Sequence, residues 1–162
     1  MLELKEKIKE YMSVYRYNHT LSVAEECKSL ADLFEIDATN LVCAAYLHDV
    51  TKEMSVEDQL QLFAEANVPL DEDTKTSPKT LHSFSAPLFI KKHFPEYAND
   101  VILNAIRFHT TARADMTLTE KLLYLADYIE PTRKFEDCKK LREFFYSSKE
   151  DKFATLDKAI LI

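Results

Sequence analysis

Histidines and aspartates stand inside apolar segments of this 162-residue chain, where side chains of these types can do chemistry. His19 lies one helical turn before Val23 on an apolar stripe. His48 and Asp49 end the apolar run LVCAAYLHD, and His109 closes VILNAIRFH. Taken singly, each histidine is more often a hydrogen-bonded core residue than a ligand. Several of them together, beside a carboxylate, indicate imidazole and carboxylate ligands for a metal ion.

Asp127 is the carboxylate that packing alone explains least well. It stands in the segment LLYLADYI with apolar neighbours on nearly every side, and an isolated buried carboxylate costs on the order of several kcal/mol. It therefore needs a cation, either a metal ion or a basic residue such as Arg16, Arg107 or Lys52. Because Asp49 supplies a second acid at the end of an apolar segment, we favour the metal. The predicted metal ligands are His19, His48, Asp49 and Asp127.

Such ligands suit first-row metals such as iron, manganese or zinc. A metal ion of this kind can lower the pKa of a bound water to roughly 7 and so provide hydroxide at neutral pH. That chemistry is typical of a hydrolase. His93, which lies between a lysine and Phe94 in a polar stretch, is assigned no role.

Three basic residues are spaced to meet an anion near this metal. Lys52 follows His48 by four residues and Arg16 precedes His19 by three, so each shares a helix face with its histidine if the helix extends that far. Arg133, beyond Pro131, is placed similarly after the seventh expected helix. For Lys52 the structural alternative is a solvated lysine at a helix end.

The chain contains no glycine, whereas an average usage of about 7% would give roughly 11. Phosphate-binding loops of the Walker and dinucleotide types need glycine so that the backbone can approach the phosphate. Tight hairpins depend on it as well. The composition therefore disfavours strands, and any phosphate must be bound by side chains, helix ends or a metal ion.

The overall balance of charge and hydropathy limits the partners of the chain. With 21 basic and 28 acidic side chains, a net charge of -7 and no densely basic stretch, nucleic acid is not an expected partner. No signal sequence opens the chain and no apolar run approaches the roughly 20 residues that span a membrane, so we expect a cytoplasmic protein. Cys27, Cys43 and Cys138 are scattered, and the first two are expected to pack in the core. The length predicts a single domain over residues 1–162.

Apolar residues recur at helical spacing almost throughout, which predicts an all-α fold that positions these side chains. Residues 69–80 are expected to form a loop that could serve as a lid. Because Pro87 is tolerated in a first turn but damages a helix interior, we expect a helix to begin after Ser85, with His82 just before it. The expected helices cover residues 2–12, 17–34, 40–49, 55–67, the segment after 85, 97–109 and 117–128, with one or two more up to residue 162.

The ordered set of His19, the pair His48 and Asp49, and Asp127 resembles the metal-binding signature of the HD-domain phosphohydrolase superfamily, which is all-helical. The flanking sequence is similar to that of the YqeK-type proteins over about residues 10–160, and LADYIEPTR is the most specific part. The matching segments are RYNHTLSVAEE at 16–26, LHDVTKE at 47–53, His82, AIRFHTT at 105–111 and LADYIEPTR at 125–133.

This resemblance implies an HD-type helical bundle with the metal site in its core. It implies hydrolysis of diadenosine tetraphosphate symmetrically into two ADP, the activity of a symmetrical bis(5'-nucleosyl)-tetraphosphatase, with iron as the metal. The implied iron ligands are His19, His48, Asp49 and Asp127. The residues implied to line the nucleotide phosphates are Arg16, Lys52, His82, His109, Thr110 and Arg133.

The expected mechanism is an in-line attack of metal-bound hydroxide on an inner phosphorus, with basic side chains neutralising the phosphate oxygens. His82 and His109 either bind a second metal or donate a proton to the leaving oxygen, and the sequence leaves both roles open. The residues assigned to catalysis are Asp49, Lys52, His82 and His109.

Two departures from the family pattern and several alternatives remain. Ser83, Ser85 and Ala112 stand where such proteins usually have glycine, which puts backbone contacts to phosphate in question. Relatives also tend to continue beyond the position of Ile162, so a reduced affinity or activity is a further expectation. The alternatives are action on another nucleotide phosphoester, a nucleotide-binding module with little turnover, and a helical interaction protein without metal. Whether the chain forms a homodimer stays open.

Overall fold

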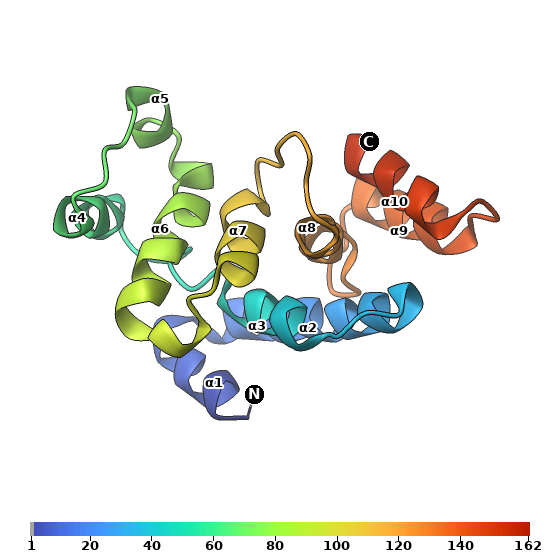
Figure 1. Ribbon diagram of the computed structural model, residues 1–162, viewed down its shortest axis with the longest axis horizontal. Helices are drawn as coiled ribbons and strands as arrows, with labels where there is room; N and C mark the ends of the chain where they lie inside the picture. Colours follow the sequence, from blue (N-terminus) through green and yellow to red (C-terminus); the bar gives the residue numbers. More distant parts are fainter. Residues whose placement is uncertain (1) are drawn as a thin grey trace.

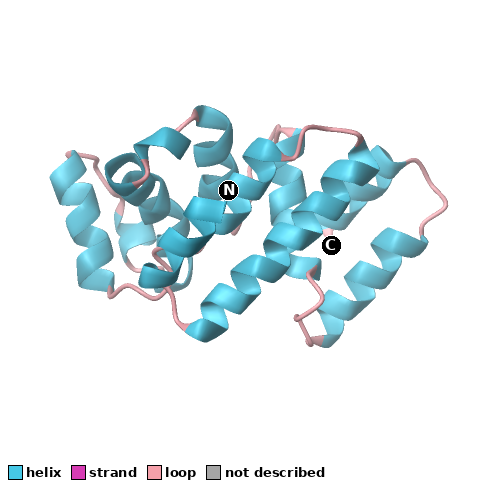
Figure 2. Cartoon of the chain, turned by 90° about the horizontal axis from the view of Figure 1, so that it is seen from below, coloured by secondary structure: helices cyan, strands magenta, loops and turns pink. Residues whose placement is uncertain are grey.

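The chain is all-α, as the apolar periodicity predicts. The computed structural model describes residues 2–162, and within them it contains helices and loops but no strand (Figures 1 and 2). None of these helices has an apolar stretch long enough to cross a lipid bilayer. The helices are α1 (Leu2–Lys7), η1 (Ile8–Tyr11), α2 (Val14–Phe34), α3 (Thr39–Leu47), α4 (Val56–Ala66), α5 (Glu72–Lys75), α6 (Pro78–His93), η2 (Pro95–Tyr97), α7 (Asp100–Phe108), α8 (Leu118–Ile129), α9 (Glu136–Ser147) and α10 (Lys152–Leu161).

Helix α3 lies at the centre of the bundle, as its apolar sequence predicts. Every residue from Leu41 to Leu47 is buried. The helix packs along α2, with α7 against α3 and α8 against both α2 and α3 (Figure 1). The three cysteines are buried too, which confirms the packing expected for Cys27 and Cys43. This arrangement brings the ends of α3 and α7 close to the second turn of α2 and the last turn of α8.

Side-chain caps begin several helices of this chain, and residues other than glycine end helices in the left-handed conformation. Ser55 caps α4, and Thr117 forms a capping box with Glu120 at the start of α8, as the sequence indicates. Glu35 ends α2 and Asn67 ends α4 in the left-handed conformation, with φ of 58° and 51°. Glycine adopts this conformation without steric cost, so a chain without glycine carries some strain at these ends.

Replacing Ala112 with glycine is expected to stabilise the protein by about 1 kcal/mol. Ala112 has a φ of 52°, and its amide donates to the carbonyl of Phe108 to close the turn after α7. Its Cβ is unfavourable there, and glycine removes it. Urea unfolding measures the change. Ala64→Gly, at an exposed position in the last turn of α4, is the control and should destabilise by up to about 1 kcal/mol. A loss of stability in Ala112→Gly would contradict the prediction.

The start of α6 is the largest departure from the expected helices. The helix begins at Pro78 and not after Ser85, so Pro87 lies in its interior. Pro78 occupies the first helical turn, where proline is favoured, and the buried residues that follow hold the helix against its neighbours. His82 therefore lies inside a helix, and its expected place before a helix N-terminus is wrong. The expected loop at 69–80 also contains α5 and the first residues of α6.

Several other boundaries shift by a few residues. The helix expected at 17–34 begins at Val14, because Ser13 accepts a hydrogen bond from the amide of Arg16 and caps it. The helix expected at 2–12 tightens into a 3₁₀ turn from Ile8. The helices expected at 40–49 and 97–109 cover Thr39–Leu47 and Asp100–Phe108.

Candidate metal centre

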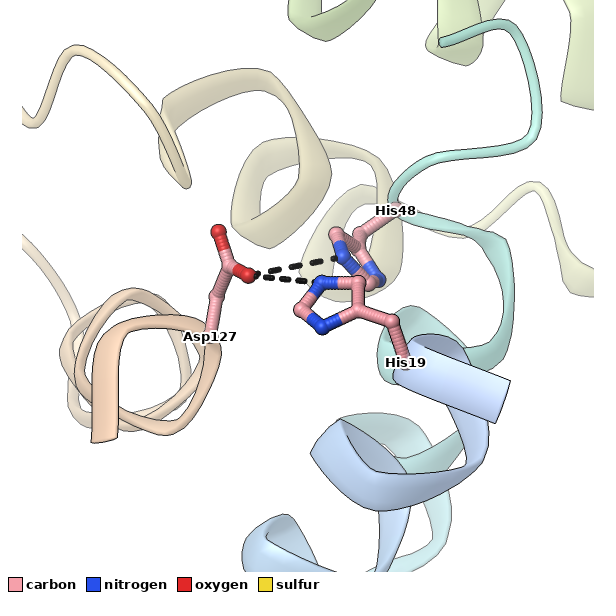
Figure 3. A group of neighbouring side chains, drawn as sticks. All are labelled: His19, His48 and Asp127. Atoms are coloured by element: carbon pink, nitrogen blue, oxygen red, sulfur yellow. Dashed lines mark ion pairs between the residues drawn. The ribbon is translucent and has the colours of Figure 1, made fainter. Parts of the chain in front are cut away.

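Three helices bring His19, His48 and Asp127 together. His19 projects from α2, His48 directly follows α3, and Asp127 lies in the last turn of α8 (Figure 3). Their ligand atoms all lie within 4.8 Å of one another. Asp127 Oδ1 is 3.0 Å from His19 Nε2 and 3.9 Å from His48 Nε2. Three of the four predicted ligands therefore form one compact group.

Asp49, the fourth predicted ligand, belongs to a second group that shares His48. The ligand atoms of His48, Asp49 and His109 also lie within 4.8 Å of one another. Asp49 Oδ2 is 3.4 Å from His48 Nε2, and its Oδ1 is 3.6 Å from His109 Nε2 and 3.2 Å from His82 Nε2. The Nε2 atoms of His82 and His109 are 3.2 Å apart. The fold thus brings together His82 of α6 and the histidines that directly follow α3 and α7.

The hydrogen bonds of the histidines fit a metal site. His19 Nε2 and His48 Nε2 are buried and make no hydrogen bond, although carboxylate oxygens lie nearby. The opposite ring nitrogens are held in place: His19 Nδ1 lies 3.1 Å from Glu130 Oε1, and His48 Nδ1 lies 2.6 Å from the carbonyl of Ala45. Metal-bound histidines use the second nitrogen in this way. Inward-facing nitrogens without a hydrogen bond, with carboxylates around them, suit a first-row metal ion.

Both aspartates have basic partners, and one of these differs from the expectation. Asp127 pairs with Arg133, whose Nη2 lies 2.6 Å from Asp127 Oδ1, and with none of the three residues suggested by the sequence. Of those, Arg16 pairs with Asp49 at 2.5 Å, and Arg107 lies over the ring of Phe84. Asp127 is also less buried than its apolar neighbours indicate, with 17% of its side chain exposed against 4% for Asp49.

The charges around the centre keep its carboxylates ionised. Burial raises the pKa of Asp49, but the neighbouring histidines, His48 and His109 among them, lower it by more. The net pKa is well below the usual value. Burial also raises the pKa of Asp127, but His19, His48 and Arg133 together outweigh it and lower the net pKa. Burial would lower the pKa of His19, but contacts with Asp127 and Glu130 raise it to about 9. A metal ion must therefore displace a proton from His19 at neutral pH.

Lys52 reaches the centre from a turn and not from a helix. Helix α3 ends at Leu47, and the amide of Lys52 donates to the carbonyl of Asp49 at 2.9 Å. Lys52 Nζ then lies 3.1 Å from His82 Nδ1, and burial lowers the pKa of this lysine. Thr51 Oγ1 donates to the carbonyl of His82 at 3.1 Å and so fixes the turn against α6.

The metal-free protein is expected to lose about 3 kcal/mol of stability as pH falls from about 6.5 to about 4. Burial lowers the pKa of His82 to about 4 from its ordinary 6.5, although Asp49 opposes the shift. Between these values the unfolded chain binds a proton that the folded chain does not, so the free energy of unfolding decreases as pH falls. Urea unfolding at several pH values measures it.

His82→Gln should lose most of this pH dependence. His93→Gln is the matched control, because His93 is exposed and stacks on the ring of Phe89 outside the centre. The control should keep the full dependence. An equal dependence in both variants would show that His82 is not the responsible group.

Glu130 is the residue at this site that the sequence analysis missed. Its side chain is fully buried, and it contacts His19 Nδ1 and the amide of Thr132. Burial raises its pKa, but these hydrogen bonds dominate and lower it to about 2. The available signal was a second carboxylate three residues after Asp127, directly before Pro131.

Thr110 Oγ1 is buried without a hydrogen bond.

The fold and this cluster define the chain as an all-helical protein whose core contains histidine and aspartate groups that could hold a divalent metal ion. A family model described as "HD domain" matches residues 16–132. The chain belongs to the HD domain family and, within it, to the YqeK-type proteins.

Three curated relatives carry the name "Bis(5'-nucleosyl)-tetraphosphatase, symmetrical". The proteins of Halalkalibacterium halodurans and Bacillus subtilis are each 34% identical; the matches cover 83% and 84% of this chain and 71% and 72% of the relatives. The protein of Staphylococcus aureus is 33% identical over 96% of this chain and 77% of its own length.

A solved structure shows the same fold. It is the crystal structure of a "predicted HD superfamily hydrolase involved in NAD metabolism" from Clostridium acetobutylicum. Its TM-score is 0.85 at 30% identity, and the match covers 98% of this chain and 80% of that one. The HD-type helical bundle predicted from the sequence is confirmed.

Proposed function

We propose that the chain, as a single domain over residues 1–162, is a metal-dependent hydrolase that cleaves diadenosine tetraphosphate symmetrically into two ADP. Three relatives named for this activity match most of the chain at 33–34% identity. The structural observation that carries the proposal is that His48 belongs to both groups of potential metal ligands. Basic side chains lie beside these groups.

The residues proposed to hold the metal are His19, His48, Asp49 and Asp127. We propose iron as the metal. When bound, a metal ion at this site would polarise a phosphate oxygen and lower the pKa of a water molecule. His109 and His82 face Asp49 Oδ1, so they are proposed either to hold a second metal with Asp49 or to deliver a proton to the leaving oxygen.

Basic side chains around the ligands are proposed to bind the phosphates. Arg16, Lys52 and Arg133 are only partly buried and each contacts a residue of the cluster. Arg16 Nε is buried without a hydrogen bond and is therefore available to a bound anion. Thr110, next to His109, offers a hydroxyl without a partner. With these side chains, phosphate recognition requires none of the glycine loops that the chain lacks.

Product analysis tests the proposal. The protein, loaded with Fe²⁺ without oxygen, is incubated with diadenosine tetraphosphate, and the nucleotides are separated. Two ADP for each substrate is the expected result. ATP with AMP would contradict symmetrical cleavage. No product from this substrate, together with hydrolysis of a nucleoside monophosphate, would favour another HD phosphohydrolase activity. Tight binding without any product would favour a nucleotide-binding module.

A further inference from the structure

The end of α8 and the turn after it, residues 129–133 and here called the turn, contact two of the metal-centre residues from outside. Glu130 contacts the Nδ1 atom of His19, and Arg133 pairs with Asp127. Pro131 in the middle of this turn has no amide to donate, so the helical hydrogen-bond pattern of α8 cannot continue through it. The turn keeps one internal backbone hydrogen bond, from the amide of Arg133 to the carbonyl of Glu130, so other groups must hold the rest of its backbone.

Arg142, on α9, provides these groups. Its Nε donates to the carbonyl of Ile129, and its Nη2 donates to the carbonyls of Glu130 at 2.6 Å and Arg133 at 3.3 Å. One guanidinium therefore binds three carbonyls of the turn. Its planar fork of donors suits this task better than the single ammonium of a lysine.

A second contact ties α9 to the helix that carries His19. Tyr146, one turn after Arg142, donates its hydroxyl to the buried carboxylate of Glu26 on α2. Burial raises the pKa of Glu26, and the hydrogen bond from Tyr146 and the charge of Arg142 oppose that rise. Helix α9 is thus hydrogen-bonded both to α2 and to the turn that carries Glu130 and Arg133.

We propose that Arg142 is a positioning residue for the metal centre, which orients Glu130 against His19 and Arg133 against Asp127. Within the described residues, its hydrogen bonds reach only the backbone carbonyls of Ile129, Glu130 and Arg133 and none of the proposed ligand atoms. It also lies outside residues 16–132, which the HD domain model matches. The inference deepens the proposed function, on which it rests, by assigning a role to a helix beyond the matched segment.

Co²⁺ binding to the metal-free protein tests this role without turnover. Arg142→Ala is expected to bind Co²⁺ about 10- to 100-fold more weakly and to change the visible absorption of the bound ion, as loss of an orienting contact does. Arg142→Lys should recover part of the affinity. Lys139→Ala, on the exposed face of the same helix, is the matched control and should bind like the wild type. A folded Arg142→Ala with wild-type affinity and spectrum would overturn the proposal.

A second variant decides the case in which Arg142→Ala does not fold. Tyr146→Phe removes only the hydrogen bond to Glu26 and is expected to weaken Co²⁺ binding by less than about tenfold. Wild-type affinity and spectra in both Tyr146→Phe and Arg142→Lys would overturn the proposal. A wild-type protein that binds Co²⁺ but does not hydrolyse diadenosine tetraphosphate would refute the proposed function and leave the role of Arg142 to be decided by the binding data.

Discussion

Asp49→Asn is expected to lower the rate of diadenosine tetraphosphate hydrolysis by about a thousandfold or more. The Asp49 carboxylate lies within 3.6 Å of the imidazoles of His48, His82 and His109, and it also pairs with Arg16. Asparagine keeps its shape but removes the negative charge that a metal ion and these side chains require. Initial rates and metal content, measured on the same preparation, test the prediction.

Glu120→Gln is the matched control for this substitution. Glu120 is also a buried carboxylate with an arginine partner, but it caps α8 and pairs with Arg113 outside the metal centre. We expect this variant to lose stability and to keep its metal content and its rate per folded molecule. Unchanged metal content and rate in Asp49→Asn would refute the proposed role of Asp49.

Arg16→Ala has the second largest expected effect, a loss of about 100- to 1,000-fold in kcat/KM. Arg16 is only 16% exposed and lies beside Asp49, where its remaining donors can neutralise a phosphate oxygen as charge develops. Because it is not a proposed ligand, the metal content should stay within about twofold of the wild type. Steady-state kinetics and metal analysis separate the two effects.

Lys28→Ala on the same helix is the control for Arg16→Ala. Lys28 pairs with Glu25 in solvent and lies away from the cluster, so its loss should leave kcat/KM unchanged. Arg16→Lys should restore only part of the activity, because an ammonium lacks the planar fork of the guanidinium. An Arg16→Ala variant with wild-type kcat/KM would remove Arg16 from the phosphate site.

The sequence was sufficient for the all-α class, for most of the helices and for grouping His19, His48, Asp49 and Asp127, but not for Glu130. Apolar spacing marks α3 as central, and the cost of a carboxylate among apolar residues singles out Asp127. Both are local properties of short segments. The same local argument misplaced the start of α6, because it treated Pro87 as a helix start although Pro78 precedes the same apolar run.

Contacts between distant segments were not accessible in this way. His19 and Glu130 are 111 residues apart, and only the packing of α2 against α8 makes them neighbours. The choice of Arg133 as the partner of Asp127 depends on how the chain turns after Pro131. Lys52 likewise reaches His82 because α3 ends at Leu47 and a turn redirects the backbone. Such pairings follow from tertiary packing, which apolar periodicity does not encode.

The absence of glycine links the fold to the proposed function. Left-handed residues other than glycine end helices at Glu35 and Asn67 and close the turn at Ala112. The same composition removes glycine phosphate loops, so side chains and a metal ion remain for binding the substrate. A strained turn beside His109 and a cluster rich in side-chain donors are two consequences of one compositional feature.

The metal content of the wild-type protein, purified without oxygen, tests the central claim most directly. Elemental analysis of the gel-filtration peak is expected to give at least about one first-row metal ion per chain, with iron as the proposed element. That metal should be lost when His48, which belongs to both ligand groups, is replaced by alanine. Less than about 0.1 metal ion per chain in a preparation that hydrolyses diadenosine tetraphosphate at full rate would contradict the account.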